Sequence, residues 1–183
     1  MALTLVLGGA RSGKSRWGEK LAAQNPPVTY IATAEARDLE MTRRIARHQA
    51  ERPGDWSTVE APYDLLSALN EASKGGSIII DCLTLYISNL LEKYSQEDVN
   101  QREKLILAEV EAVASLSEGH PANIIIISNE VGLGLVPPSA LGREFRDLCG
   151  WANQRLAKRA QRVYYTVAGI ALDIKELGVD IFA

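Results

Sequence analysis

The sequence lacks several features that would mark whole classes of protein. Its 183 residues include only two cysteines, Cys82 and Cys149, which lie far apart and match no metal-ligand or C-x-x-C spacing. We interpret them as small core residues of a protein from a reducing compartment. Positive charge is not in excess, because 20 Lys and Arg are set against 23 Asp and Glu, a net charge of −3. That balance argues against a general nucleic-acid binder.

Long apolar runs are missing too. No segment approaches the ~20 consecutive apolar residues of a membrane-spanning helix. The chain begins directly with a short apolar run and shows no basic segment followed by a long apolar one, so we expect a cytoplasmic protein without a leader or a membrane span. Hydrophobic residues make up 46% and charged residues 23% of the chain. These values suit a single globular domain over residues 1–183 with one substantial core.

What the chain does have is an alternation of short apolar runs and helical patterns. Runs rich in Val, Ile and Leu on both faces predict strands buried in a parallel sheet; they cover residues 3–7, 28–32, 77–81, 123–128 and 162–167. Helical patterns lie between them, at residues 14–24, 39–52, 63–72, 83–93, 101–117 and 139–160. The alternation predicts a doubly wound α/β fold, with one or two short edge strands within residues 169–182.

The motif with the clearest chemistry follows the first apolar run. It matches the pattern G-x-x-x-x-G-K-[ST] of a phosphate-binding P-loop between a strand and a helix. Its residues are Gly8, Gly9, Ala10, Arg11, Ser12, Gly13, Lys14 and Ser15. The glycines let backbone N–H groups close around phosphates, Lys14 reaches the β- and γ-phosphates, and the Ser15 hydroxyl is a ligand for Mg²⁺. A glycine-rich turn without a ligand is the alternative.

A second motif supports the first. The apolar strand at residues 77–81 ends in Asp81, as the Walker B strand of nucleotide-binding proteins does, and this places a carboxylate at the sheet edge where α/β proteins bind ligands. We predict that Asp81 holds Mg²⁺ together with Ser15. An Asp that merely forms a turn would look the same, so the prediction depends on the pairing with the P-loop. Together the motifs predict a three-layer, RecA-like P-loop NTPase fold, a mostly parallel sheet flanked by helices.

His48 is one of only two histidines. In the predicted helix at residues 39–52 it shares a face with Met41 and Ile45, so we expect it to face the protein or an interface. On spacing alone a packed histidine is the better interpretation, and a nucleophile or acid–base group is the alternative. The other histidine, His120, precedes Pro121 and is interpreted as a loop residue.

A polar cluster follows the strand at residues 123–128. Ser128, Asn129 and Glu130 come first, and Gly132 and Gly134 follow. The cluster lies at the predicted ligand edge of the sheet, where loops often carry function. An ordinary crossover loop explains the pattern equally well.

Taken in order, these motifs resemble one family over nearly the whole chain. They are the P-loop at 8–15, YIATA at 30–34, RI at 44–45 with His48, RP at 52–53, DCLTL at 81–85, SNEVG at 128–132, FRD at 145–147 and NQRLA at 153–157. The set closely resembles the bifunctional adenosylcobinamide kinase / adenosylcobinamide-phosphate guanylyltransferases of coenzyme B12 biosynthesis. The P-loop alone would be generic, whereas the ordered set is specific.

The resemblance implies an activity. The enzyme would phosphorylate adenosylcobinamide with ATP or GTP and then transfer GMP from GTP to give adenosylcobinamide-GDP and pyrophosphate. The family carries the guanylyl group on a histidine in the helix after the second strand. Only His48 occupies that place, which reverses the preference drawn from spacing alone. The resemblance also implies a homotrimer with small-molecule substrates.

The resemblance further implies a set of contacts to the guanine nucleotide. By position these are Thr33, Ala34, Glu35, Glu51, Arg52, Glu60 and Asp81. Some relatives have Glu where this chain has Asp81. Both carboxylates ligate Mg²⁺, but the shorter side chain reaches less far towards a guanine edge.

Two other functions compete with this interpretation. A small-molecule P-loop kinase without guanylyl transfer would bind nucleotide and form no phosphohistidine. A non-enzymatic GTP-binding switch or assembly module would usually need a guanine-specifying N-K-x-D motif, which the sequence does not contain. GTP turnover without dependence on cobinamide would support the switch.

Overall fold

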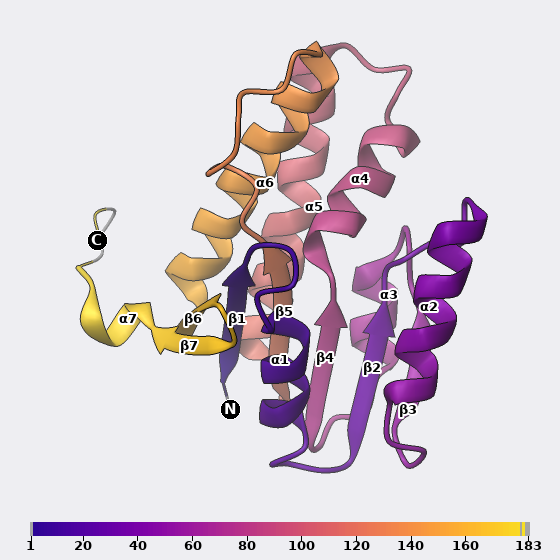
Figure 1. Cartoon of the computed structure of the whole chain (residues 1–183), viewed down its shortest axis with the longest axis vertical. Coiled ribbons are helices and arrows are strands. Elements are labelled where there is room, and N and C mark those ends of the chain that lie inside the picture. The colour runs from indigo at the N-terminus through magenta and orange to yellow at the C-terminus, as the bar shows by residue number, and fades with distance from the viewer. Residues whose placement is uncertain (1, 180, 182–183) are drawn as a thin grey trace.

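A mostly parallel sheet forms the centre of the protein (Figure 1). The computed structural model describes residues 2–179 and 181, and its seven strands lie in the order β3-β2-β4-β5-β1-β6-β7. All neighbours pair in parallel except β7, which runs antiparallel to β6. The strands are β1 (Leu3–Gly8), β2 (Val28–Ala32), β3 (Ser57–Glu60), β4 (Ser77–Asp81), β5 (Asn123–Asn129), β6 (Arg162–Val167) and β7 (Ile170–Asp173).

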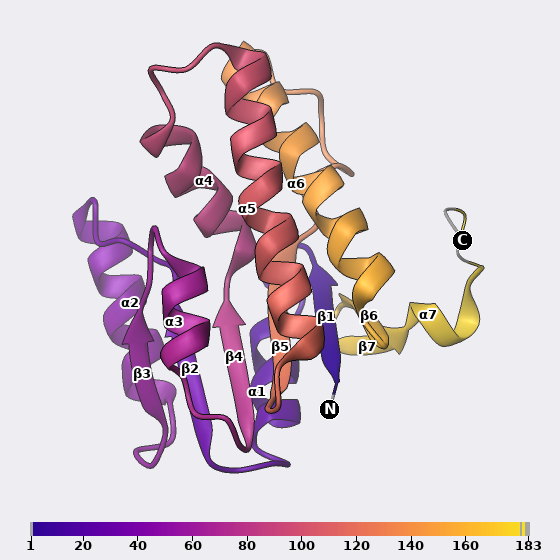
Figure 2. The same ribbon diagram turned by 180° about the vertical axis from the view of Figure 1, so that it is seen from behind.

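Helices cover both faces of this sheet. They are α1 (Lys14–Ala22), α2 (Leu39–Glu51), α3 (Leu65–Glu71), α4 (Leu83–Lys93), α5 (Val99–Gly119), α6 (Ala140–Arg159) and α7 (Ile174–Leu177). Helices α1 and α2 lie on the face turned to the viewer in Figure 1, and α3, α5 and α6 lie on the opposite face (Figure 2). The predicted three-layer α/β architecture is therefore confirmed.

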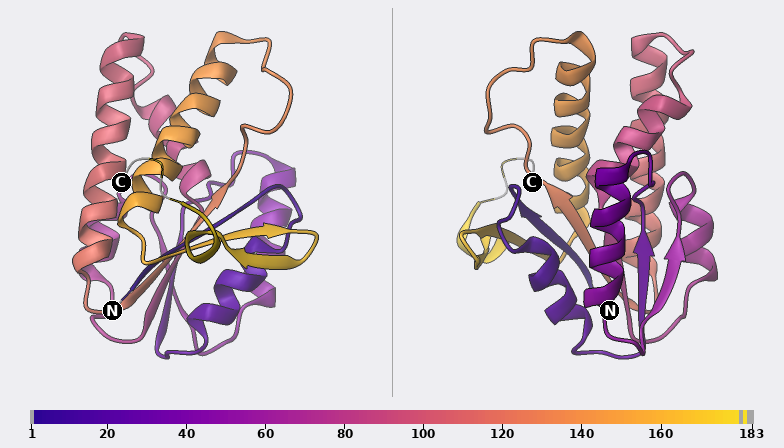
Figure 3. Two further views of the ribbon diagram at one scale, coloured as in Figure 1. Left: turned by 90° about the vertical axis from the view of Figure 1, so that its left-hand side faces the viewer. Right: turned by 45° about the vertical axis from the view of Figure 1, so that its right-hand side comes forward.

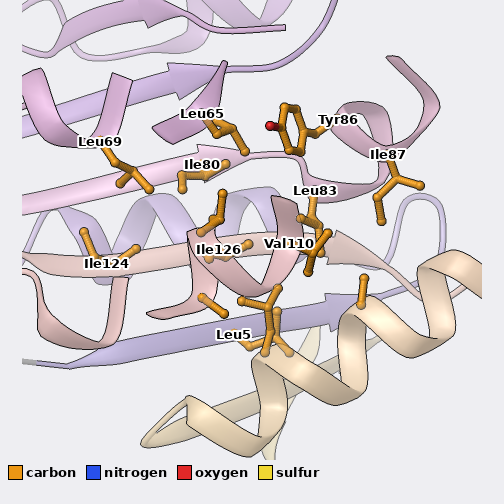
Figure 4. Packing of buried hydrophobic residues seen from close by; sticks show 14 of the residues in the cluster. Leu5, Leu65, Leu69, Ile80, Leu83, Tyr86, Ile87, Val110, Ile124 and Ile126 are labelled. Carbon is orange, nitrogen blue, oxygen red and sulfur yellow. The ribbon is translucent and has the colours of Figure 1, made fainter. Parts of the chain in front are cut away.

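The core consists of two apolar layers, one on each face of the sheet. Strand β4 shows why both exist, since Ile78 and Ile80 point into the larger layer while Ile79 points into the smaller one. In the larger layer Ile80 packs near Leu65 of α3 and Tyr86 of α4 (Figure 4). Side chains alternate across a strand, so a strand that is apolar at every position is buried on both faces, as the sequence predicted.

The register of the sheet brings the ends of its strands to one edge. Gly8 of β1 pairs with Asn129 of β5, and Ala32 of β2 lies between Asp81 of β4 and Glu60 of β3. All of these residues stand at or next to the carboxyl ends of parallel strands. The chain crosses from β1 to β2 on one side and from β5 to β6 on the other, so a topological switch point lies beside the P-loop, where such sheets bind ligands.

Most predicted elements are confirmed, and their bounds shift by a residue or two. The strands at 28–32, 77–81 and 162–167 and the helix at 83–93 match their predictions, while α3 and α5 begin directly after Asp64 and Asp98. Each of these aspartates accepts hydrogen bonds from backbone N–H groups of the first helical turn, as N-caps do. Within residues 169–182, the described part forms one edge strand, β7, and the short helix α7.

One strand was not predicted. Strand β3 has the sequence STVE and is mostly exposed at the edge of the sheet, so it shows no run of buried apolar residues. Figure 3 shows the two ends of the sheet, with β6 and β7 at the edge opposite β3 and α7 next to them in the chain. None of the helices in the described part of the chain has the length and apolar character needed to cross a bilayer. Cys82 and Cys149 are both buried and free, as core residues.

Candidate nucleotide-binding site

The P-loop backbone adopts the conformation that its glycines allow. Gly13, the last residue before α1, has a φ of 98°, in the left-handed region that favours glycine. Gly8 is needed for a different reason, because a Cβ atom there would lie 2.2 Å from Thr166 Oγ1. Glycine therefore serves at one position for conformation and at the other for close approach.

The loop is also held from outside by the hairpin of β6 and β7. The hydroxyls of Ser12 and Thr166 are 2.8 Å apart, and Thr166 also donates to the carbonyl oxygen of Leu7. The backbone N–H of Gly169, at the hairpin turn, donates to the carbonyl oxygen of Ser12 at 2.9 Å. These contacts fix the shape of the phosphate cradle without a ligand.

Helix α1 begins immediately after the loop, so its first N–H groups and its positive dipole end are directed at the loop. Lys14 is the first helical residue, and its ammonium group donates to the carbonyl oxygen of Gly9 at 3.2 Å. Ser15 follows in the same turn and is half-buried. A cation, a hydroxyl and the N-terminus of a helix thus lie together at the end of the loop, as phosphate binding requires.

Asp81 ends strand β4 and is oriented by a tyrosine from the neighbouring strand. The Tyr30 hydroxyl donates to Asp81 Oδ2 at 2.8 Å. Burial, together with the nearby carboxylate, raises the pKa of Tyr30 well above its usual range. The phenol therefore stays protonated and acts as a hydrogen-bond donor.

Helix α2 brings His48 to the same region. Asp38 caps the helix by accepting a hydrogen bond from the Met41 N–H at 2.7 Å. The prediction that His48 shares a face with Met41 and Ile45 is confirmed, and this face lines a pocket rather than the core. His48 is half-buried there.

This pocket, with a volume of about 230 Å³, brings half of the predicted residues together. Those that line it are Lys14, Ser15, Ala34, Glu35, His48, Arg52, Glu60 and Asp81. They come from α1, from α2 and its C-cap, from the segment after β2, and from the ends of β3 and β4. The first two residues of α1, Lys14 and Ser15, therefore share one cavity with the imidazole of His48.

Other predicted residues do not line the pocket wall. Gly8 to Gly13 form the loop backbone beside it, and the side chain of Glu51 lies outside the described residues. Thr33 is fully buried, and its hydroxyl donates to the Cys82 carbonyl and accepts from the Cys82 N–H, both at 2.8 Å. The structure thus gives Thr33 a supporting place, because its hydroxyl is fully buried and bonded to the Cys82 backbone.

The segment after β2 is fixed by polar contacts at the rim of the pocket. Glu35 accepts hydrogen bonds from Tyr63 at 2.8 Å and from Arg37 at 2.9 Å, which lower the pKa of its carboxyl group. The buried Asn89 side chain donates to the carbonyl oxygens of Thr33 and Pro62, both at 2.9 Å. These bonds hold Ala34 and Glu35 against the cavity.

Asn129 and Tyr30 are among the lining residues that the sequence did not assign to the site. Asn129, which the sequence singled out only as part of a polar cluster, lies between the P-loop strand and β4, and its N–H donates to Thr84 Oγ1 at 2.8 Å. Tyr30 lies inside a buried strand, where an aromatic residue is expected to be part of the hydrophobic core. The signal available for both was their place near the carboxyl ends of parallel strands.

Two residues that looked structural in the sequence are structural. His120 ends helix α5 as its C-cap, and its Nδ1 accepts a hydrogen bond from the Ala122 N–H at 3.1 Å. Cys82 touches the pocket but is almost fully buried, and this burial raises the pKa of its thiol to about 12. The thiol therefore stays protonated and is a poor nucleophile.

The oxygen donors in the pocket suit one kind of metal. Ser15 and Asp81 both line it, and among the described residues no group of three or more His, Cys, Asp or Glu is placed to hold an ion. A protein site with one carboxylate and one hydroxyl fits Mg²⁺, which is commonly bound through substrate phosphates and water as well.

Comparisons with known proteins identify the family of the chain. The family model for "Cobinamide kinase / cobinamide phosphate guanyltransferase" matches residues 4–174. The "Bifunctional adenosylcobalamin biosynthesis protein CobP" of Pseudomonas aeruginosa is 46% identical over 173 residues, which cover 93% of this chain and 96% of that protein. The "Bifunctional adenosylcobalamin biosynthesis protein CobU" of Escherichia coli K12 is 38% identical over 180 residues, 94% of this chain and 99% of that protein.

A solved structure supports the fold alone. A "prototypical ATPase from the type III secretion system of pathogenic bacteria" superposes with a TM-score of 0.60 at 11% identity and covers 99% of this chain and 59% of that chain. The P-loop NTPase fold predicted from the sequence is thereby confirmed. The matches over most of the sequence show that the chain belongs to the cobinamide kinase / cobinamide phosphate guanyltransferase family.

Proposed function

We propose that this protein phosphorylates adenosylcobinamide with ATP or GTP and then transfers GMP from GTP to adenosylcobinamide phosphate, giving adenosylcobinamide-GDP and pyrophosphate. The observation that carries the proposal is the shared pocket. Lys14 and Ser15 of the P-loop line it together with His48 of α2. A kinase without guanylyl transfer would need only the first pair, so the imidazole in the same cavity favours the bifunctional enzyme.

In the kinase step the P-loop does most of the work. The substrate hydroxyl oxygen attacks the γ-phosphorus, and a new O–P bond forms while the bond to the β–γ bridging oxygen breaks. The hydroxyl proton passes to solvent. Lys14 and the loop N–H groups stabilise the charge that moves onto the leaving nucleoside diphosphate.

In the transferase step His48 is the nucleophile. An imidazole nitrogen attacks the α-phosphorus of GTP, a P–N bond forms, and pyrophosphate leaves as the α–β bridging bond breaks. A phosphate oxygen of adenosylcobinamide phosphate then attacks the same phosphorus and breaks the P–N bond. The imidazole loses a proton to solvent in the first step and regains one in the second. Covalent catalysis in this way divides one difficult displacement into two.

We also assign the metal ligands. Ser15 and Asp81 hold Mg²⁺ together with the nucleotide phosphates, and the bound ion neutralises phosphate charge. Asp81 already has one oxygen fixed by the Tyr30 hydroxyl. Glu35, Arg52 and Glu60 remain candidates for contacts to the guanine nucleotide, because each lines the cavity.

The proposal includes the setting in which the enzyme works. We place one domain with both activities in the cytoplasm, as a homotrimer acting on small molecules, which the family resemblance implies. The net charge of −3 supports small-molecule substrates over nucleic acid. Light scattering on the purified protein measures the subunit number directly, and a monomeric mass would overturn the trimer.

Labelling with GTP tests the nucleophile. GTP carrying ³²P at the α-position should transfer label to the protein, stable in base and lost in acid, and adenosylcobinamide phosphate should remove it. His48→Ala should abolish labelling. His120→Asn is the matched control, because it changes the other histidine, keeps a side-chain hydrogen-bond acceptor and lies outside the pocket; it should label like the parent. Normal labelling of His48→Ala would show that the nucleophile is wrongly assigned.

A further inference from the structure

Tyr30 connects two parts of the pocket that come from distant segments of the chain. It stands in β2 and is 2% exposed. Its hydroxyl donates to Asp81 Oδ2 at 2.8 Å, and the centre of its ring lies 3.5 Å from the Arg52 guanidinium carbon. One side chain thus contacts both the proposed metal ligand and an arginine of the pocket wall.

The Tyr30 ring packs directly against the Arg52 guanidinium. Its Nη1 reaches Thr58 Oγ1 only at 3.4 Å, and its Nε is buried without a hydrogen-bond partner. A guanidinium over an aromatic face is held by cation–π attraction and by dispersion. Tyr30 therefore determines where the Arg52 donors lie in the cavity.

The position of Arg52 extends this connection to the nucleophile. Arg52 is the C-cap of α2 and follows His48 by four residues, so both project from one side of the last turn of the helix. Both line the pocket. Contact between Tyr30 and Arg52 consequently anchors the histidine-bearing helix to the strand next to Asp81.

We propose that Tyr30 is a positioning residue for the nucleotide and its metal. Its hydroxyl orients the Asp81 carboxylate for Mg²⁺, and its ring presents Arg52 to the nucleotide. The proposal rests on the assignment of Asp81 as a metal ligand. It differs from simple core packing, because phenylalanine would fill the same space in β2 but could not hold the carboxylate.

A measurement of metal binding distinguishes orientation of Asp81 by the Tyr30 hydroxyl from simple core packing by its ring. Mn²⁺, followed by electron paramagnetic resonance in the presence of GTP, replaces Mg²⁺ as the probe. Tyr30→Phe should weaken Mn²⁺ binding by about tenfold, as loss of a group that orients a metal ligand does. Metal-free GTP binding and the thermal midpoint should stay close to the parent, since the ring still supports Arg52.

Two further variants make the result decisive. Asp81→Asn should weaken Mn²⁺ binding more than Tyr30→Phe does. Tyr86→Phe is the matched control, because its buried hydroxyl also donates to a carboxylate, that of Glu109 at 2.6 Å, and neither residue lines the pocket. It should leave Mn²⁺ binding unchanged.

The outcomes distinguish the two proposals. If Tyr30→Phe binds Mn²⁺ like the parent while Asp81→Asn does not, the role of Tyr30 is wrong and the metal assignment stands. If Asp81→Asn also binds like the parent, the metal assignment fails and the Tyr30 role fails with it. A loss in Tyr86→Phe equal to that in Tyr30→Phe would reduce the effect to a general loss of stability and overturn the proposal.

Arg52→Lys tests the ring contact on its own. Lysine keeps the positive charge but loses the planar group that stacks on the ring. The KM for GTP should rise by about tenfold, as expected when one charge-assisted contact is lost, while Mn²⁺ affinity changes far less. An unchanged KM would exclude a role for the ring contact in nucleotide binding.

Discussion

Helices α1 and α2 lie on the same face of the sheet and serve one pocket, but they are anchored very differently (Figure 3). In α1, Ala22 is fully buried and Gly18 fits closely against Ile127 and Ile79 of the sheet. In α2, no described side chain is buried, and its half-buried Met41, Ile45 and His48 face the cavity. The helix that follows the P-loop is thus packed into the core, whereas the helix that carries His48 covers the site.

The difference suits the two chemistries. Phosphates need a cradle that is formed before they arrive, because preorganised dipoles stabilise the transition state without reorganising. In the proposed mechanism, by contrast, His48 must reach the α-phosphorus in one step and leave the pocket usable in the other. We expect a helix held mainly by contacts over the cavity to gain contacts when a nucleotide binds.

The largest expected effect is a loss of one activity, but not the other, when His48 of α2 is replaced. His48→Ala should lower guanylyl transfer by on the order of 10³-fold or more, as removal of a covalent nucleophile does. The kinase step should fall by less than about tenfold, because it depends on the P-loop. The measurement is two separate assays, one with ATP and adenosylcobinamide and one with GTP and adenosylcobinamide phosphate. Equal losses in both assays would mean that α2 serves the two steps alike.

A smaller expected effect is a difference in folding stability between a substitution in α1 and one in α2. A Cβ at Gly18 would already lie 3.0 Å from Ile127 Cδ1, so Gly18→Leu should lower the free energy of unfolding by about 2 kcal/mol or more through overpacking. Ala46→Leu on the exposed side of α2 is the matched insertion and should change it by less than about 0.5 kcal/mol. Urea denaturation followed by circular dichroism gives both values. Similar losses would contradict the difference in packing.

The smallest effect concerns local opening. Backbone amides of α2 should exchange with deuterium faster than those of α1, because few buried contacts oppose its opening. GTP with Mg²⁺ should slow exchange in α2 more than in α1. Mass spectrometry of peptides covering each helix reads out both rates. Equal protection before GTP is added would show that α2 is anchored as firmly as α1.

The same contrast explains what the sequence predicted and what it did not. Local patterns were sufficient for the P-loop, for Asp81 at a strand end and for the face that His48 shares with Met41 and Ile45, because each depends on neighbours in the chain. The exposed strand β3 was not predicted, since STVE has no buried apolar run.

Contacts between distant segments could not be predicted from any local sequence pattern. The pairing of Ser12 with Thr166 spans 154 residues, and that of Tyr30 with Asp81 spans 51. Thr33 was placed by resemblance among the nucleotide contacts, yet its hydroxyl is used by the Cys82 backbone. Such roles depend on which strands become neighbours, and this follows from the topology of the whole sheet.

The central claim is that the P-loop and His48 act on the same nucleotide, and Lys14→Ala tests it most directly. Lys14 would hold the β- and γ-phosphates of the GTP whose α-phosphorus His48 attacks. The rate of His48 labelling by α-³²P GTP at a subsaturating concentration should therefore fall by about 10²-fold, the loss expected from removing one electrostatic group. Labelling of Lys14→Ala at the parent rate would contradict a single shared pocket.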